Sequence, residues 1–128
     1  MNIQLDTESG VPLYLQIVRQ IEYMILSGIL KPGDFLPSIK DLAVELHIHP
    51  KIVYHTYKEL SKEKILTFSE RAFVIPADAI AVIAEKKPEI LAELLDTAIK
   101  RAFSLGFTRE EIASVFNYRL HRNRKNEN

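Results

Sequence analysis

The sequence predicts a mainly α-helical fold with a small β-wing: a winged helix-turn-helix followed by a C-terminal two-helix dimerisation element. Three observations support this prediction. Residues 36–60 contain two short helical patterns separated by a tight turn. Two strand-like segments follow within residues 65–75. From residue 78 onward the apolar pattern is purely helical.

The first expected element is a helix that begins at Pro12. Its apolar residues recur at helical spacing, and they are Leu13, Ile17, Val18, Ile21, Ile25 and Leu26. Tyr14 and Tyr23 of this helix are most simply core residues. Gly28 lies where the helix should stop. Residues 31–34, Lys-Pro-Gly-Asp, predict a turn, and Phe35-Leu36 predicts a short strand before Pro37.

The helix pair comes next. Ser38 is a typical N-cap for its first helix, and Asp41 places a carboxylate near the positive helix end. Pro50 suits the first turn of the second helix, because an N–H at that position has no intrahelical partner. The apolar face of the first helix contains Ile39, Leu42, Ala43 and Leu46, and the inner stripe of the second contains Val53, Thr56, Tyr57 and Leu60. In such a pair the second helix lies in the DNA major groove, and its outer face here carries Lys51, Tyr54, His55 and Lys58.

The wing is expected from two strands, Ile65–Phe68 and Ala72–Ile75, joined by a tight connection at residues 69–71. Asp78 is then a candidate cap for a short helix over residues 79–85, and Pro88 begins a helix that runs to about Leu105. Gly106 is a stop signal. Thr108 and Glu111 have the spacing of a capping box that opens the last helix.

The C-terminal helices have apolar stripes that are too broad for two short helices to bury alone. We therefore expect a winged helix-turn-helix DNA-binding domain at residues 1–77 and a helical dimerisation region with a basic tail at residues 78–128. The alternative is a monomer in which these helices cap the domain. The tail, 119–128, either extends a DNA footprint or is a solvated end. The expected dimer interface comprises Ile90, Leu91, Leu94, Leu95, Ala98, Ile99, Ala102, Phe103, Ile112, Val115 and Phe116.

Composition narrows the functional classes. The 128 residues include no cysteine, which excludes disulfides and thiol catalysis. The N-terminal residues do not resemble a signal peptide and no apolar run is long enough to cross a membrane, so a cytoplasmic protein is expected. His47, His49 and His55 match no standard metal-ligand spacing. We expect no metal, cofactor or enzymatic activity, and no polar constellation identifies a small-molecule effector.

Several stretches resemble the GntR superfamily of bacterial transcription regulators, in its small YtrA-like branch. The similarity covers about Pro12 to Ile75, and the inter-helix turn at residues 105–111 also resembles that branch. The matching stretches are Pro12-Leu13-Tyr14-Leu15-Gln16-Ile17, the run from Ser27 to Ser38 with its Pro32-Gly33 and Leu36-Pro37-Ser38, Lys40-Asp41-Leu42-Ala43, His49-Pro50-Lys51-Ile52-Val53 and Tyr57-Lys58-Glu59-Leu60.

The resemblance implies a homodimeric, sequence-specific regulator, most simply a repressor, that binds double-stranded DNA at a palindromic operator. The alternative for the basic residues is ordinary solvated charge paired with Asp41, Glu45 and Glu59. The implied DNA-binding residues are Ser38, Lys40, His49, Pro50, Lys51, Tyr54, His55, Lys58 and Arg71.

The sequence also departs from the family pattern. Lys40 replaces the family arginine and loses its bidentate fork. Lys51 and Ile52 replace an asparagine and a threonine. The wing connection is shortened, lacks the family glycines and carries Glu70. The shortened wing, Glu70 and the formal net charge of zero favour a rival function, a protein-interaction module on a winged-helix scaffold with weakened or lost DNA reading.

Overall fold

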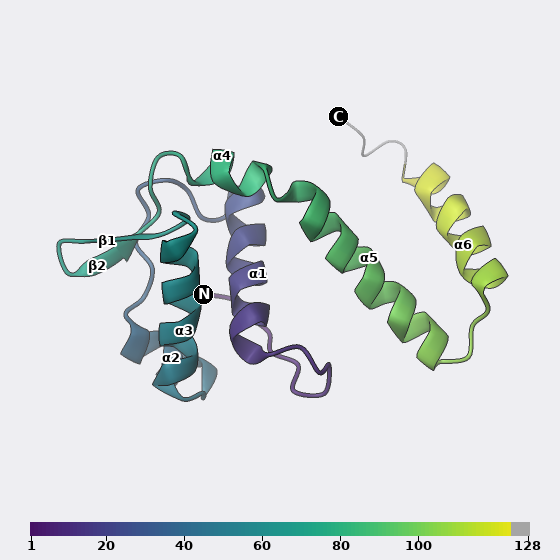
Figure 1. The fold of residues 1–128 in the computed structure, drawn as a ribbon, viewed down its shortest axis with the longest axis horizontal. Coiled ribbons are helices and arrows are strands. Elements are labelled where there is room, and N and C mark those ends of the chain that lie inside the picture. The colour runs from purple at the N-terminus through teal and green to yellow at the C-terminus, as the bar shows by residue number, and fades with distance from the viewer. Residues whose placement is uncertain (124–128) are drawn as a thin grey trace. The chain divides into compact units, whose positions relative to one another are not determined.

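The structure, a computed structural model, describes residues 1–123 and contains six helices and one two-stranded sheet within that range (Figure 1). The chain divides into two compact units, with the boundary between Lys87 and Pro88. The architecture confirms the predicted winged helix with C-terminal helices. The expectation that the DNA-binding domain ends at residue 77 and the dimerisation region begins at residue 78 stays a prediction.

Three helices form the core of the first unit: α1 (Leu13–Leu26), α2 (Ile39–Leu46) and α3 (Pro50–Lys62). Both α1 and α2 pack on α3. The predicted inner stripe of α3 is entirely buried, as are Ile17, Ile21 and Ile25 of α1. Tyr57 of this stripe donates a hydrogen bond to the carbonyl oxygen of Pro37 at 2.8 Å, which joins α3 to the start of α2. Tyr14 and Tyr23, also expected in the core, are only half-buried.

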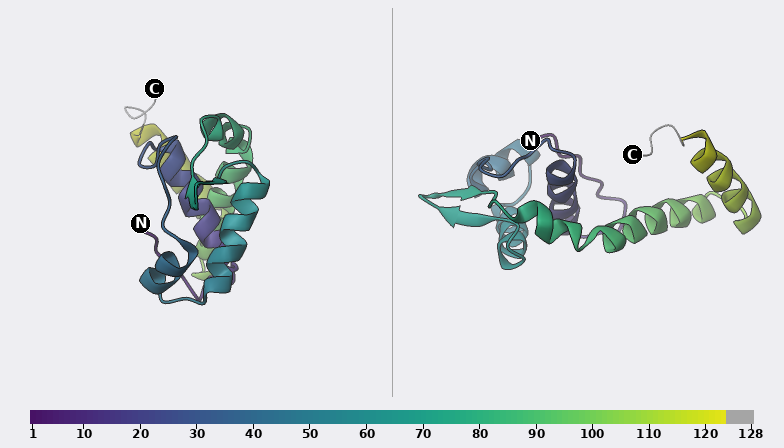
Figure 2. Two further views of the ribbon diagram at one scale, coloured as in Figure 1. Left: turned by 90° about the vertical axis from the view of Figure 1, so that its left-hand side faces the viewer. Right: turned by 90° about the horizontal axis from the view of Figure 1, so that it is seen from above.

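The wing consists of β1 (Thr67–Ser69) and β2 (Ala72–Val74), which pair antiparallel with Phe68 opposite Phe73. It projects from the helices of the first unit, as Figure 2 shows. The prediction that the first strand begins at Ile65 is wrong, because the amides of Ile65 and Leu66 donate to the carbonyl of Leu60 at the end of α3. The expected strand at Phe35-Leu36 is a single bridge between Phe35 and Val74. Ile75 lies beyond β2. Its carbonyl accepts a hydrogen bond from the amide of Gly33, and its amide donates to the carbonyl of Asp34, just before Phe35.

A short helix, α4 (Ala79–Ala84), completes the first unit and packs on α1 through the buried side chains of Ala79 and Ile83. The prediction that Asp78 caps this helix is wrong. Asp78 precedes the helix, but its side chain makes no capping hydrogen bond, and its φ and ψ of −97° and 10° differ from the extended backbone of a typical N-cap.

The second unit contains α5 (Lys87–Ser104), which begins one residue before the boundary, and α6 (Arg109–Arg122). The predicted capping box is confirmed: the Thr108 side chain accepts from the amide of Glu111 at 3.1 Å, and the Glu111 carboxylate accepts from the amide of Thr108 at 2.9 Å. The hydrogen bond from the Thr108 amide to the carboxylate lowers the pKa of Glu111. Of the basic tail, residues 124–128 lie outside the described part of the chain.

Candidate nucleic-acid interface

The helix-turn-helix presents its predicted DNA-binding residues at the starts of α2 and α3. Ser38 caps α2, and its hydroxyl accepts from the amide of Asp41 at 3.0 Å. His49 caps α3, where its Nδ1 accepts from the amide of Lys51 at 3.0 Å, and Pro50 is the first residue of that helix. The left-handed backbone of His47, with φ of 56°, ends α2 and redirects the chain into the turn. Both helix starts are therefore built by local hydrogen bonds.

The outer face of α3 carries the other predicted recognition residues. Lys51, Tyr54, His55 and Lys58 are all exposed, and their spacing places them on one side of the helix. The Lys58 ammonium lies 5.9 Å from the centre of the Tyr54 ring, a cation–π distance. The His55 Nε2 lies 3.9 Å from a carboxylate oxygen of Glu59. This face therefore combines two lysines with two rings that can hydrogen-bond.

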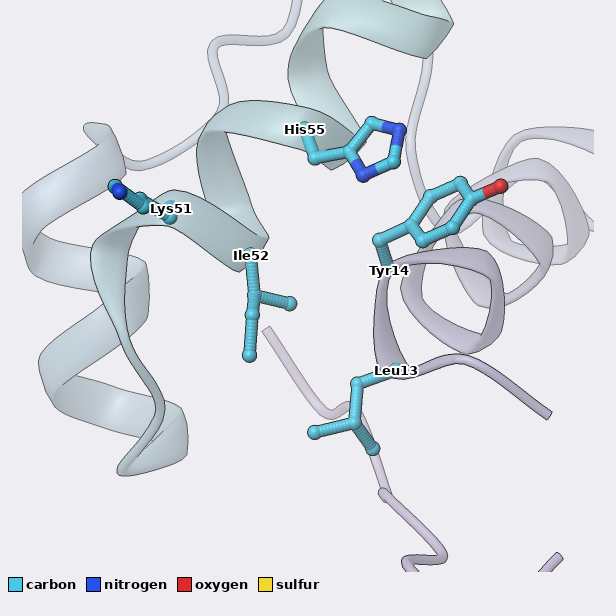
Figure 3. A pocket seen from close by; sticks show the side chains of 5 residues that line it. All are labelled: Leu13, Tyr14, Lys51, Ile52 and His55. Carbon is cyan, nitrogen blue, oxygen red and sulfur yellow. The ribbon is translucent and has the colours of Figure 1, made fainter. Parts of the chain in front are cut away.

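A hollow borders this face where α3 meets the start of α1 (Figure 3). Leu13 and Tyr14 line it from α1, and Lys51, Ile52 and His55 line it from α3. The Tyr14 and His55 rings stack with centroids 3.7 Å apart and an interplanar angle of 17°. The buried hydroxyl of Thr56 donates to the carbonyl of Ile52 at 2.9 Å and lies 3.4 Å from the carbonyl of Tyr14, so the two carbonyls share its single hydrogen. The start of α1 is thus fastened directly to the recognition helix.

A second hollow separates the start of α2 from the wing. Its polar residues are Ser38, Lys40 and Arg71, and its apolar wall contains Leu36, Ile39, Phe68, Ala72 and Phe73. The Phe68 and Phe73 rings lie 4.9 Å apart, and Phe73 in turn packs edge-on against Tyr57 of α3 at 4.7 Å. Phe68 is nevertheless 61% exposed. Two cations, a helix N-terminus and a partly exposed aromatic ring therefore converge at one opening, and none of its lining residues is acidic.

The wing turn is strained. Glu70 and Arg71 join β1 to β2 with φ of 50° and 70°, although neither is a glycine. Two consecutive residues with positive φ define a type I′ turn, which asparagine and glycine normally occupy. Left-handed backbone costs a non-glycine residue about 1–2 kcal/mol. This turn brings Arg71 into the lining of the hollow beside Lys40.

The four predicted phosphate-binding cations are not neutralised by an acidic residue in the described part of the chain. Across residues 1–123, Lys40, Lys51, Lys58 and Arg71 form no salt bridge within 4.0 Å. The acidic residues considered as their partners have other arrangements: Glu45 binds the N-terminal amine at 3.1 Å, and Glu59 faces His55. The positive charge of this surface therefore remains available for an anionic partner.

Two residues of this surface were missing from the sequence-based prediction. The sequence predicts Tyr14 in the core and Phe68 in a strand, without a surface role for either residue. The alternation of the wing contains a usable signal for Phe68, because its direct opposition to Phe73 places two large aromatic rings on one face of a two-stranded ribbon. No local signal identifies Tyr14, because its contact with His55 joins distant parts of the chain.

Comparison with known proteins agrees with the winged helix-turn-helix fold described above. Residues 13–72 match the family described as "Bacterial regulatory proteins, gntR family". The chain is 37% identical over 111 residues to the HTH-type transcriptional repressor YtrA of Bacillus subtilis, covering 86% of this chain and 85% of that protein. The chain belongs to the GntR family. It is a transcriptional regulator of that family, as its sequence resemblance implied.

Solved structures of GntR regulators share the fold. YtrA from Sulfolobus acidocaldarius, a GntR-family transcription factor, has a TM-score of 0.58 and 32% identity, and the match covers 94% of this chain and 97% of that one. A GntR family transcriptional regulator from Listeria monocytogenes has a TM-score of 0.64 and 26% identity, with coverage of 89% and 98%. Both matches extend over most of the C-terminal helices as well as the winged helix.

The predicted dimer-interface residues are mostly solvent-exposed within one GntR chain. Ala98 is exposed, Ala102 and Ile112 are half-buried, and Ile90 is buried at 4% exposure. Seven larger apolar residues of the expected interface are exposed: Leu91, Leu94, Leu95, Ile99, Phe103, Val115 and Phe116.

In the part of the chain that the structure describes, none of the helices has the length and apolar character needed to span a membrane.

Proposed function

We propose that this GntR-family chain is a cytoplasmic repressor that binds a palindromic operator as a homodimer. The recognition face of α3 enters the major groove, while Ser38, Lys40 and Arg71 hold the phosphate backbone beside it. The observation that carries the proposal is a set of four cations along α2, α3 and the wing that form no salt bridge within residues 1–123. Neutralisation of phosphates by such residues supplies most of the affinity of DNA-binding proteins.

The direct base contacts are assigned to α3. Lys51 reaches base edges or phosphates from the first turn, and Tyr54, His55 and Lys58 extend the contact surface along the helix. His49 and Pro50 fix where the helix starts, and therefore which turn enters the groove. Phe68 adds an apolar wall against which a deoxyribose packs while Lys40 and Arg71 bind its phosphate.

The homodimer is supported by the apolar surface of α5 and α6. Leu91, Leu94 and Phe103 are each about half-exposed in the single chain, as are Val115 and Phe116. Contiguous apolar surface of this kind marks an interaction site on a soluble protein. A two-fold dimer presents two recognition helices to two half-sites, which explains a palindromic operator. The name of the Bacillus subtilis relative supports repression as the outcome.

The test is selection of bound duplexes from a random DNA library, followed by measurement of affinity for the selected site against salt concentration. We expect a palindromic site and an affinity that falls steeply as salt rises. Light scattering on the free protein reports whether it is dimeric. Absence of enrichment, with only weak binding at low salt, would contradict DNA reading and support the protein-interaction module that Glu70 and the zero net charge favour.

A further inference from the structure

The first unit contains a buried carboxylate that DNA binding does not use. Glu22 of α1 is fully buried, and it is the one charged residue in the buried class across residues 1–123. The side chain of Arg19 donates to its Oε1 at 2.8 Å, and the ammonium of Lys86 donates to its Oε2 at 2.7 Å. Both oxygens of Glu22 are therefore bound by cations from different elements.

Lys86 extends this cluster to a third element. Its ammonium also donates to Oε2 of Glu63, the C-cap of α3, at 2.6 Å. Burial alone would lower the pKa of Lys86, but hydrogen bonds and charges from Glu22 and Glu63 outweigh burial and raise the pKa above its ordinary value. Lys86 therefore stays charged and joins α1, the end of α3 and the segment that follows α4.

The stability of the fold alone does not require charged side chains at these positions. A buried ion pair can often be replaced by apolar residues of similar volume without loss of stability, and the best-attested use of buried charge is to select one arrangement of packed elements. The apolar contact of α4 with α1 rests on only two fully buried side chains, Ala79 and Ile83. Such a contact has little directional preference, whereas the two short charge-assisted hydrogen bonds of Lys86 have a strong one.

We propose that Glu22 and Lys86 are a positioning pair that fixes the direction in which the chain leaves the winged helix, and that this direction determines the half-site spacing accepted by the dimer. Lys86 lies one residue before the start of α5, so its anchoring controls the path toward the helices assigned to dimerisation. This inference rests on the proposed function. The pair touches no DNA and acts through the placement of two recognition helices.

The test uses Glu22→Met/Lys86→Met, which removes the directional bonds but keeps side-chain volume, and Lys86→Met, which leaves Glu22 paired with Arg19. Lys87→Met is the matched control, because Lys87 is the adjacent lysine and is exposed. Each protein is offered duplexes in which the two selected half-sites are separated by different numbers of base pairs. Circular dichroism and light scattering verify that each variant is folded and dimeric.

We expect the wild type and Lys87→Met to select one spacing. The double variant should accept several spacings and lose about tenfold in affinity at the preferred one, while its affinity for a single half-site is unchanged. Lys86→Met removes the same two bonds between elements and should show the same change in spacing preference. Should the double variant not fold, Lys86→Met decides the question. A folded variant with the wild-type spacing preference would overturn the proposal.

A second measurement separates this inference from the proposed function. The chain lacks cysteine, so Lys62→Cys on the exposed end of α3 provides one spin-label site per protomer. The label-to-label distance distribution in the free dimer should be narrow for wild type and broader for the double variant. If no DNA is selected but the distribution broadens, DNA reading is wrong and the positioning role holds. An unchanged distribution contradicts the positioning role whatever the DNA result.

Discussion

The phenol ring of Tyr14 stacks on the imidazole of His55 at a centroid distance of 3.7 Å, so the first turn of α1 supports the outer face of the recognition helix. This contact places Tyr14 beside the proposed DNA-binding surface rather than in the core. The stack restricts the movement of the His55 imidazole, although the His55 side chain is about half-exposed. A ring held in one place before binding loses less conformational entropy when DNA arrives.

Tyr14→Ala should therefore weaken operator binding by about threefold to tenfold, because an aromatic stack is worth about 0.5–1.5 kcal/mol. Tyr14→Phe keeps the ring and is the matched control, with affinity expected near wild type. Fluorescence anisotropy with a labelled operator duplex measures both. Equal affinities for the alanine and phenylalanine variants would show that the stack does not prepare His55 for DNA.

The strained wing turn offers a matched pair of substitutions. Arg71→Gly and Glu70→Gly each relieve one left-handed residue, but only the first removes a cation from the hollow beside Lys40. Arg71→Gly should weaken binding and reduce the slope of log affinity against log salt by about 1, because one phosphate contact is lost. Glu70→Gly should leave the slope unchanged and bind at least as tightly, because it removes a carboxylate from the wing tip.

Both wing variants should keep or slightly raise the free energy of unfolding, since relief of about 1 kcal/mol of backbone strain is offset by the greater entropy of glycine in the unfolded chain. Urea denaturation at neutral pH measures this balance. A salt slope that is the same for Arg71→Gly and wild type would place Arg71 outside the DNA contact.

The fold was predictable from sequence where its signals are local. Ser38 and Thr108 cap their helices as expected, and Pro50 opens the recognition helix, because each of these features depends on residues within one helical turn. The strand limits were wrong at Ile65 because the end of α3 competes for its amide. The sequence alone does not reveal that Lys86 folds back onto Glu22, since no short-range pattern encodes a contact between residues so far apart.

The candidate site likewise has one part that the sequence predicts and another part that depends on tertiary packing. The face formed by Lys51, Tyr54, His55 and Lys58 follows from helical periodicity, and the structure places all four on the exposed side of α3. The hollow beside this face and the hollow between α2 and the wing depend on tertiary packing of α1 and of the wing against the helix pair. The sequence therefore does not identify Tyr14 and Phe68 as residues of this surface.

The stability of the first unit should fall in alkaline solution. Burial, together with the charge of Glu45, raises the pKa of Tyr57 above its ordinary value, and the pKa of Lys86 is raised as well. In the unfolded chain these groups release protons near their ordinary pKa values of about 10 and 10.4. A raised folded pKa means that the stabilising contribution is complete below that range and is lost as pH rises through it.

Tyr57 alone should lower the free energy of unfolding by up to about 1.4 kcal/mol for each pH unit above pH 10, until the folded pKa is reached. Urea denaturation between pH 8 and pH 12 measures this slope. Tyr57→Phe removes the titrating hydroxyl and its hydrogen bond to Pro37, so it should cost about 1 kcal/mol at neutral pH and flatten the alkaline slope. Tyr54→Phe, at an exposed site, is the control and should keep the wild-type slope.

The exposed apolar face of α5 should control the oligomeric state. Leu94→Glu places a charge among the residues assigned to the dimer interface, where Leu91, Leu95 and Phe103 are also exposed. Burial of an unpaired charge at an interface centre should weaken dimerisation by about 2 kcal/mol or more. Ile29→Glu is the matched control, because Ile29 lies in the first unit and is 70% exposed.

Sedimentation equilibrium should detect the shift of Leu94→Glu toward monomer, with Ile29→Glu indistinguishable from wild type. The folded monomer should still bind one half-site, because α2, α3 and the wing belong to the first unit. It should lose the avidity for the full palindrome, which requires two linked recognition helices. A Leu94→Glu protein that remains dimeric would remove this face of α5 from the interface and leave the exposed residues of α6, Val115 and Phe116, as the surface to test next.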